Sequence, residues 1–476
     1  MIFNSFQFFV FLTIVLTAYW LVSHRRQNLL LLLASYVFYG WWDYRFLSLI
    51  MISTVVDFFV AQRLHREVDQ VVRRRWLFAS LGVNLGILAT FKYFDFFIDS
   101  AVSLLESVGL SAHPSTLAIV LPVGISFYTF QTISYTFDVY RRRIEPERNL
   151  LTFGVYVAFF PQLVAGPIER AQHLLPQIQA VRVRPSVEKV WSGSWLILTG
   201  LFKKIVLADG LATVVQTRFE SPDQHGGLSL LIGVYAFAIQ IYGDFSGYSS
   251  IARGVSRLFG IELMRNFEQP YLSTSISQFW RTWHISLSTW LWDYLYVPLG
   301  GSRRGTRRTY INLGLTMLLG GLWHGAAWTF VVWGGLHGLY LSAHRVVGAY
   351  EPRGRPVAPR LSDLWRIAVT FHLVAFAWIF FRADSLGAAV DYIQGALARL
   401  GSLAAGDGGS LSAQAAGVLV FGVMMFALDW IDRNRQRYRP LEKWSPLLLG
   451  TALAVIIAAL VVFSGDTVVP FIYFQF

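Results

Sequence analysis

Long apolar runs separated by short polar stretches repeat along the whole 476-residue chain. Each run approaches the ~20 residues that a helix needs to cross a bilayer. The pattern therefore predicts an all-α protein that crosses the membrane many times, with about 11 to 12 transmembrane helices. No basic segment precedes the first run, residues 2–22, and no small-residue cleavage site follows it. We therefore expect this run to be a retained spanning helix rather than a signal peptide.

Two stretches depart from simple spanning helices. Residues 153–170, "FGVYVAFFPQLVAGPIER", are apolar but interrupted by Pro161, Gly166 and Pro167. Residues 274–301, "TSISQFWRTWHISLSTWLWDYLYVPLGG", interleave tryptophans with polar groups. Non-helical backbone persists at membrane depth only where protein or water covers it. The pattern therefore predicts two re-entrant or interfacial segments that line a cavity.

Lysine and arginine gather in alternate connections between the apolar runs. The basic connections include "SHRRQN", "QRLHREVDQVVRRRW", "YRRRIEPERN" and "GGSRRGTRR", whereas "DSAVSLLESVGLSAHPST" carries no lysine or arginine. Basic connections mark the cytoplasmic side of membrane proteins. The net charge of +12 is therefore explained by membrane topology, and we expect no nucleic-acid partner.

Composition supports the same class of protein. Hydrophobic residues make up 55% of the chain and charged residues only 14%, below the roughly one quarter usual in soluble domains. No soluble segment interrupts the pattern, so we expect one integral-membrane domain over residues 1–476. Cysteine is absent, which excludes disulfides, cysteine-ligated zinc and an acyl-thioester on the protein itself.

Two histidines in apolar surroundings are the first candidates for chemistry. His324 lies in "GLWHGAAW", where Gly320, Gly321 and Gly325 allow close approach of a backbone or a ligand. His284 lies in the tryptophan-rich stretch "FWRTWHISLSTW". A polar side chain at membrane depth is costly and usually has a partner or a function. A neutral imidazole can take a proton from a hydroxyl and return it to a leaving group, which suits acyl transfer.

A third cluster, "IQIYGDFSGYSSIARG", places polar side chains inside an apolar run. We expect it to contact substrate together with the tryptophans beside the two histidines; the expected substrate-binding residues are Trp323, Asp244, Ser246, Tyr248 and Trp283. For Asp244 a buried hydrogen bond between helices is an equally simple explanation. His337 is expected to be structural, and Lys203 and Lys204 are expected to snorkel or to pair with a carboxylate. No metal site is expected.

Several motifs together resemble the membrane-bound O-acyltransferase family. They are "FYGWWDYRF", "LPVGISFYTFQTISYTFDVYRR", "FFPQLVAGPIER", "IYGDFSGYSSIARGVSRLFGIELMRNFEQPYLSTSISQFWRTWHISLSTWLWDYLYVPLGG" and "LLGGLWHGAAWTFVVWGGLHG". Within the family, the sequence is similar to the bacterial membrane subunits of exopolysaccharide O-acetylation, such as that of alginate. The resemblance implies an irregular ring of helices around a central funnel. It also implies that His324 is catalytic and that His284 matches a second histidine of the bacterial branch.

The resemblance further implies the reaction and its setting. We expect a multi-pass enzyme of the bacterial inner membrane that moves acetyl groups from a cytoplasmic donor, acetyl-CoA, to an exported polysaccharide such as alginate or cellulose. No permanently bound cofactor is expected. The expected partners are membrane lipids, a periplasmic acetyltransferase of the SGNH type and the machinery of polysaccharide synthesis and export. Two alternatives stay open: an enzyme of the same superfamily that D-alanylates teichoic acid, and a non-enzymatic transporter of a sugar or lipid intermediate.

Overall fold

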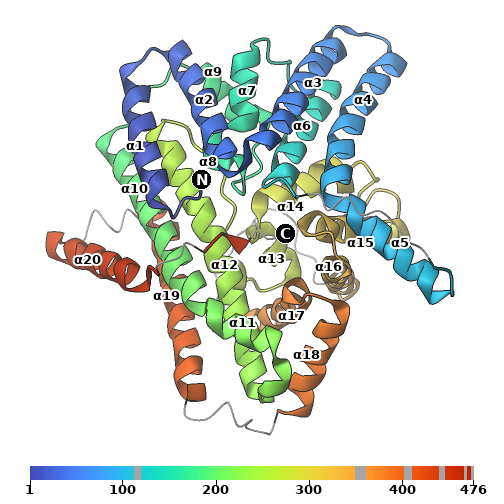
Figure 1. Cartoon of the computed structure of the whole chain (residues 1–476), viewed down its shortest axis with the longest axis vertical. Helices are drawn as coiled ribbons and strands as arrows, with labels where there is room; N and C mark the ends of the chain where they lie inside the picture. Colours follow the sequence, from blue (N-terminus) through green and yellow to red (C-terminus); the bar gives the residue numbers. More distant parts are fainter. Residues whose placement is uncertain (112–119, 349–360, 401–409, 439–444, 466–468, 473–476) are drawn as a thin grey trace. The chain divides into compact units, whose positions relative to one another are not determined.

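The computed structural model describes residues 1–111, 120–348, 361–400, 410–438, 445–465 and 469–472. The regular structure of these residues is helical throughout, and no strand occurs among them (Figure 1). The all-α prediction is therefore confirmed. The chain divides into two units, one formed by residues 1–197 and 252–264 and the other by residues 198–251 and 265–476. Helices α10 and α12 pass from one unit into the other, and the single-domain assignment stays a prediction.

The first unit contains the helices drawn from blue to green in Figure 1. They are α1 (Phe6–Leu21), α2 (His24–Asp43), α3 (Leu47–Arg66), α4 (Gln70–Leu88), α5 (Phe94–Ser107), α6 (Ile125–Tyr140), α7 (Leu150–Ala158), α8 (Phe160–Leu163), α9 (Ala171–Gln179) and most of α10 (Val187–Leu201). Two short turns interrupt them, η1 (Tyr44–Phe46) and the π-helical η2 (Ala89–Tyr93).

Buried polar side chains hold α3, α4 and α6 together. Asp57 is fully buried on α3 and accepts hydrogen bonds from Ser80 (2.5 Å) and Asn84 (2.8 Å) of α4. The amide oxygen of Asn84 in turn accepts from Ser53 (2.6 Å) and from Thr132 of α6 (3.2 Å). Between membrane helices the hydrophobic effect contributes little, so such hydrogen bonds help to specify which helices pack together.

The second unit contains the remaining helices. They are α11 (Ala212–Glu220), most of α12 (Gly227–Leu258), α13 (Ile276–Thr282), α14 (Ile285–Leu291), α15 (Thr306–His324), α16 (Trp328–Val346), α17 (Leu364–Arg382), α18 (Leu386–Ala398), α19 (Ser410–Tyr438) and α20 (Pro446–Phe463). Short turns also occur: η3 (Phe202–Ala208), η4 (Asp209–Leu211), η5 (Pro222–Gln224), η6 (Pro270–Leu272), η7 (Trp292–Tyr296) and η8 (Leu361–Asp363).

The two stretches that differ from simple spanning helices each contain several short helices. Residues 153–170 contain the end of α7, the four-residue α8 and a non-helical segment from Val164 to Arg170. Residues 152–169 are all buried, so protein covers this irregular backbone. The tryptophan-rich stretch forms α13, α14 and the π-helical η7. Whether either stretch lines a cavity stays a prediction.

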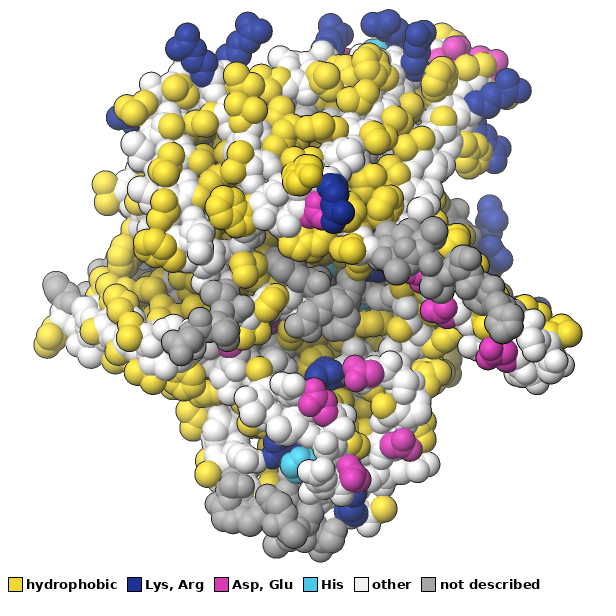
Figure 2. Space-filling view, in the orientation of Figure 1, with side chains coloured by type: hydrophobic (Ala, Val, Ile, Leu, Met, Phe, Trp, Pro, Cys, Tyr) yellow, Lys and Arg dark blue, Asp and Glu magenta, His cyan; other side chains and the backbone are white. Residues whose placement is uncertain are grey.

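The helices include several that can cross a bilayer. Five described segments are long and apolar enough: residues 24–66, 70–107, 227–258, 361–382 and 411–432. The first contains both α2 and α3, and the second contains α4 and α5. Figure 2 shows lysine and arginine side chains gathered at the upper edge of the view, above a broad band of hydrophobic side chains. A polytopic membrane protein is thus confirmed, while the number of crossings and the ring with a central funnel stay predictions.

Candidate active site

His324 occupies the last position of α15 and is only 4% exposed. Glycines bring α15 and α16 into contact just before it. A Cβ atom on Gly321 would overlap the carbonyl oxygen of Phe330, and a Cβ atom on Gly334 would overlap that of Met317. The close backbone approach predicted from the glycines is therefore confirmed, and it fixes the helix end that carries His324.

His284 lies at the N-terminal cap of α14 in the left-handed region, with φ 42° and ψ 56°. This conformation is uncommon for a residue with a side chain and needs support from its surroundings. Asn266 supplies that support, because its backbone oxygen accepts from the Ile285 amide (2.9 Å) and its side-chain oxygen from the Ser286 amide (3.3 Å). The Asn266 side-chain nitrogen donates to Ser249 of α12 (3.3 Å). Asn266 is thus a positioning residue that sequence reasoning missed.

The two imidazoles come together although 40 residues separate them in sequence (324 − 284 = 40). Their ring centroids are 6.2 Å apart. The indole of Trp323 contacts both, at 5.8 Å from His284 and 5.0 Å from His324. Trp333 (5.0 Å) and Phe381 (5.6 Å) pack edge-on against His324. Two proton-accepting groups thus share one buried aromatic enclosure, and the contact of Trp323 with substrate stays a prediction.

Trp283 is fully buried in the aromatic core next to His284. Its ring stacks on Phe279 (5.6 Å, 17°) and packs against Trp378 (5.0 Å) and Tyr242 (5.9 Å). These contacts give Trp283 a packing role that supports the backbone of His284. Its predicted contact with substrate stays a prediction.

Asp244 is buried on α12 with an ion-pair partner. Its carboxylate accepts from the Lys204 ammonium (2.8 Å) and from the backbone amide of Ile472 (2.9 Å). The neighbouring residue, Phe245, packs edge-on against the ring of His284 at 4.7 Å. Because consecutive helical residues point about 100° apart, Asp244 and Phe245 face different neighbours. The structure thus gives Asp244 buried polar partners, which is the second explanation that the sequence allowed for this residue.

Ser246 and Tyr248 are buried on the same helix. Tyr248 packs edge-on against Phe471 at 4.9 Å, so the C-terminal residues 469–472 lie beside this cluster. The hydroxyl oxygen of Ser246 makes no hydrogen bond with the described residues. A contact of either residue with substrate stays a prediction.

The two adjacent lysines pair with carboxylates, as one of the two sequence hypotheses expected. Lys203 donates to Asp429 of α19 (2.6 Å), which also accepts from the Tyr242 hydroxyl. Lys204 donates to both Asp209 and Asp244 at 2.8 Å. Burying a charge is costly unless it is paired and hydrogen-bonded, so these pairs account for two buried lysines in an apolar helix.

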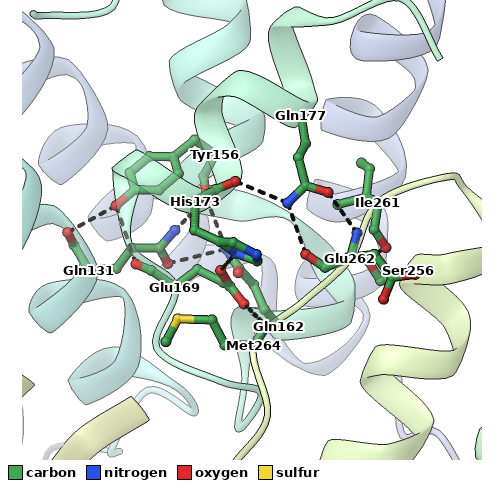
Figure 3. Close-up of polar contacts among 10 residues, drawn as sticks. All are labelled: Gln131, Tyr156, Gln162, Glu169, His173, Gln177, Ser256, Ile261, Glu262 and Met264. Atoms are coloured by element: carbon green, nitrogen blue, oxygen red, sulfur yellow. Dashed lines mark hydrogen bonds and ion pairs between the residues drawn. The ribbon is translucent and has the colours of Figure 1, made fainter. Parts of the chain in front are cut away.

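A second polar cluster lies in the first unit (Figure 3), and its central pair, Glu169 and His173, lies outside the candidate membrane spans. Glu169 is fully buried, accepts from the Met264 amide (2.5 Å) and contacts His173 at 2.7 Å. Burial raises the pKa of Glu169, with the hydrogen bond from His173 opposing that shift. Glu169 in turn raises the pKa of the half-exposed His173. Glu169 lies in the non-helical segment before α9 and His173 in its first turn, so helical spacing in the sequence gave no signal for this pair. No group of three or more His, Asp or Glu residues in the described chain is placed to hold a metal ion.

Comparison with known proteins places this geometry in a family. The model of the MBOAT, membrane-bound O-acyltransferase family, matches residues 144–381. The matched segment includes both histidines of the enclosure. A probable alginate O-acetylase AlgI of Pseudomonas putida is 38% identical, and the alignment covers all of both chains.

Two further relatives are similar over most of their length. A probable alginate O-acetylase AlgI of Pseudomonas aeruginosa is 44% identical over 81% of this chain and 73% of its own. A peptidoglycan O-acetyltransferase of Helicobacter pylori is 34% identical over 83% of this chain and 79% of its own.

Proposed function

The chain belongs to the membrane-bound O-acyltransferase family, and from this premise we propose that it transfers acetyl groups to an exported polysaccharide. It is an acyltransferase embedded in a membrane. The proposed membrane is the bacterial inner membrane, and the proposed donor is acetyl-CoA on the cytoplasmic side. Alignments of 34–44% identity with proteins named as O-acetylases support acetyl as the transferred group.

The observation that carries the proposal is the pair of imidazoles in one buried enclosure, His284 and His324, at 6.2 Å. In the proposed step His324 takes the proton of the acceptor hydroxyl while the hydroxyl oxygen forms a bond to the acetyl carbon. The bond between that carbon and the donor sulfur then breaks, and the thiolate leaves with a proton returned by the imidazole. His284 orients the substrate or holds the donor, on a backbone supported by Asn266.

The surroundings suit such a step. Both histidines are at most 4% exposed and are enclosed by aromatic side chains, which keeps bulk water from competing with the acceptor hydroxyl. The chain has no cysteine, so the acetyl group passes without a protein thiol. In the proposed pathway a periplasmic acetyltransferase of the SGNH type receives the group and acts with the polysaccharide synthesis and export machinery.

The names of the relatives bear on the acceptor. Two are named for alginate and one for peptidoglycan. The three names thus have a glycan in common, but not the same polymer. We accordingly propose a glycan as the final acceptor, with alginate or cellulose as the first polymers to assay. Transfer of a D-alanyl group to teichoic acid is the alternative within the superfamily.

Reconstituted protein and labelled acetyl-CoA test the proposal. With a glycan acceptor present, we expect wild-type protein to cleave the donor thioester and His324→Ala to do so about 10²–10⁴-fold more slowly, as removal of a general base usually causes. His337→Asn is the matched control, because His337 is fully buried nearby, where its Nδ1 accepts from Trp280 (3.2 Å). It should lose stability but keep its rate per folded molecule within about threefold. Movement of a sugar or lipid without thioester cleavage would instead establish a transporter.

A further inference from the structure

A pocket of about 410 Å³ opens in the first unit, at the end of α9 that follows His173. It is formed by the end of α9, the connection to α10, the first turn of α10 and the turn after α12 at Gly260. Three of the residues that line it are cationic, namely Arg182, Arg184 and Lys189, and none of the lining residues is a carboxylate. An uncompensated positive pocket of this kind is suited to an anion.

Both arginines are held in place by neutral oxygen atoms. Arg182 donates from Nη2 to the Asn28 side chain (2.5 Å) and to the Ile178 carbonyl (3.0 Å). Its buried Nε makes no hydrogen bond with the described residues. Arg184 donates from Nη2 to the Trp20 carbonyl at 3.1 Å. These partners orient the guanidinium groups without neutralising them, and an arginine fork matches the oxygen geometry of a phosphate.

The wall of the pocket is also fixed. Gln177 donates from its side-chain nitrogen to the carbonyl oxygens of His173 and Glu262, both at 3.0 Å. Its side-chain oxygen accepts from the Glu262 amide at 2.8 Å (Figure 3). Gln177 thereby joins the end of α9 to the segment after α12. A ligand would find the pocket largely formed before it binds, which lowers the entropic cost of binding.

Exposed valines surround the cations. Val181, Val183 and Val187 are 76%, 81% and 85% exposed. Valine alternates with arginine in "VRVR", so apolar and cationic side chains share one short connection. In a protein embedded in a membrane, exposed apolar groups beside cations suit the boundary between acyl chains and headgroups.

We propose that this pocket binds the phosphate of an anionic phospholipid headgroup. Arg182, Arg184 and Lys189 contact the phosphate oxygens, and the exposed valines contact the upper part of the acyl chains. A soluble nucleotide such as the phosphorylated end of a thioester donor offers the same phosphate chemistry. It has no acyl chains to cover three valines, and for that reason the lipid is the occupant that the surface favours.

Native mass spectrometry of the purified full-length protein tests the assignment. The probes are phosphatidylglycerol, phosphatidylcholine and 3′,5′-ADP, each titrated separately. The test variant is Arg184→Gln with Lys189→Gln, two exposed positions. The matched control is Arg66→Gln with Arg75→Gln, which removes the same charge from exposed positions at the α3–α4 connection. We expect the test variant to bind phosphatidylglycerol roughly 25-fold more weakly, since each of the two removed surface cations contributes about fivefold. Phosphatidylcholine, whose choline cation neutralises its phosphate, should bind weakly to all three proteins, and the control variant should bind phosphatidylglycerol as the wild type does.

Each other outcome overturns the assignment. Equal phosphatidylglycerol binding by all three proteins would show that the pocket holds no phosphate. An equal loss in the control variant would show a general charge effect rather than a site. Binding of 3′,5′-ADP that the test variant loses, with lipid binding unchanged, would assign the pocket to a soluble nucleotide instead.

Discussion

The imidazole rings of His284 and His324 lie 6.2 Å apart and are inclined by 59°. A flat acyl group held between two ring faces needs about 7 Å, because each contact between carbon atoms takes about 3.5 Å. The acyl group must therefore approach the edges of the rings, where the nitrogen atoms lie, rather than enter between their faces. The 6.2 Å distance therefore favours proton transfer at the edge of an imidazole ring over binding of the substrate between the two ring faces.

Replacement of Asn266 should reduce catalysis by displacing His284. Asn266→Ala removes the side-chain acceptor of the Ser286 amide, and the left-handed backbone of His284 loses support. We expect kcat to fall by about 10–100-fold, because displacements near 1 Å have effects of this size. The KM for the donor should change by less than about threefold, since Asn266 touches no substrate in the proposed step. Steady-state kinetics of thioester cleavage give both values.

The control for this prediction is Ser249→Ala. Within the part of the chain that the structure describes, Ser249 accepts one side-chain hydrogen bond, from the Asn266 nitrogen at 3.3 Å, so its loss should change kcat by less than about threefold. If both variants lower kcat equally, Asn266 acts through general packing and not through the position of His284.

The close packing of α15 and α16 predicts a strong effect of one methyl group. Gly321→Ala places a Cβ against the Phe330 carbonyl, so the two helices must separate. Overpacking of this kind costs about 1–3 kcal/mol, and it also shifts the helix end that carries His324. We expect a lower melting temperature in detergent together with lost transfer activity.

Gly314→Ala is the matched control within the same helix. Nothing lies within 4 Å of a Cβ added at Gly314. Its melting temperature and activity should equal those of the wild type. A wild-type melting curve for Gly321→Ala would show that the two helices are not in contact in the membrane protein.

Part of this architecture was predictable from the order of residues. Apolar runs of bilayer length predict the helices, and the glycines around His324 predict close packing. The distance between His284 and His324 was not predictable, because it depends on how α13, α14 and α15 fold against one another. The partners of Lys204 were also not predictable. Asp244 lies 40 residues away in sequence, and only the tertiary fold brings it to Lys204 (244 − 204 = 40). The pair of Glu169 and His173 was hidden as well, because Glu169 lies in the non-helical segment before α9, where helical spacing does not apply.

The Glu169–His173 pair predicts a pH dependence of stability. Glu169 raises the pKa of His173 above the ordinary value of 6.5. A raised histidine pKa stabilises the fold at low pH, and this contribution is lost as the pH rises through the folded-state pKa. The pKa of Glu169 is also raised, by burial, which acts in the same direction. From about pH 6 to pH 8 the melting temperature of the wild type should fall by roughly 1–2 °C more than that of His173→Gln. The effect is small because the His173 side chain is 41% exposed.

Thermal unfolding in detergent at the two pH values measures this difference. His65→Gln is the control, since His65 is exposed on α3. Its pH dependence should equal that of the wild type. A His173→Gln protein with the wild-type pH dependence would show that the pair does not contribute.

The order of the chemical steps at His324 is open to a direct test. With no cysteine in the chain, acetyl leaves the donor thioester either by direct attack of the acceptor hydroxyl or through an acetyl-imidazole on His324. Three aromatic rings pack within 5.0–5.6 Å of the His324 ring, which is 4% exposed. The glycine-lined close packing at the end of α15 suits bringing donor and acceptor together at this ring. We therefore predict direct attack, with donor and acceptor bound together.

Rapid-quench measurement with labelled acetyl-CoA and no acceptor should show no burst of free CoA. A burst equal to the enzyme concentration, absent in His324→Ala, would instead establish the acetyl-enzyme.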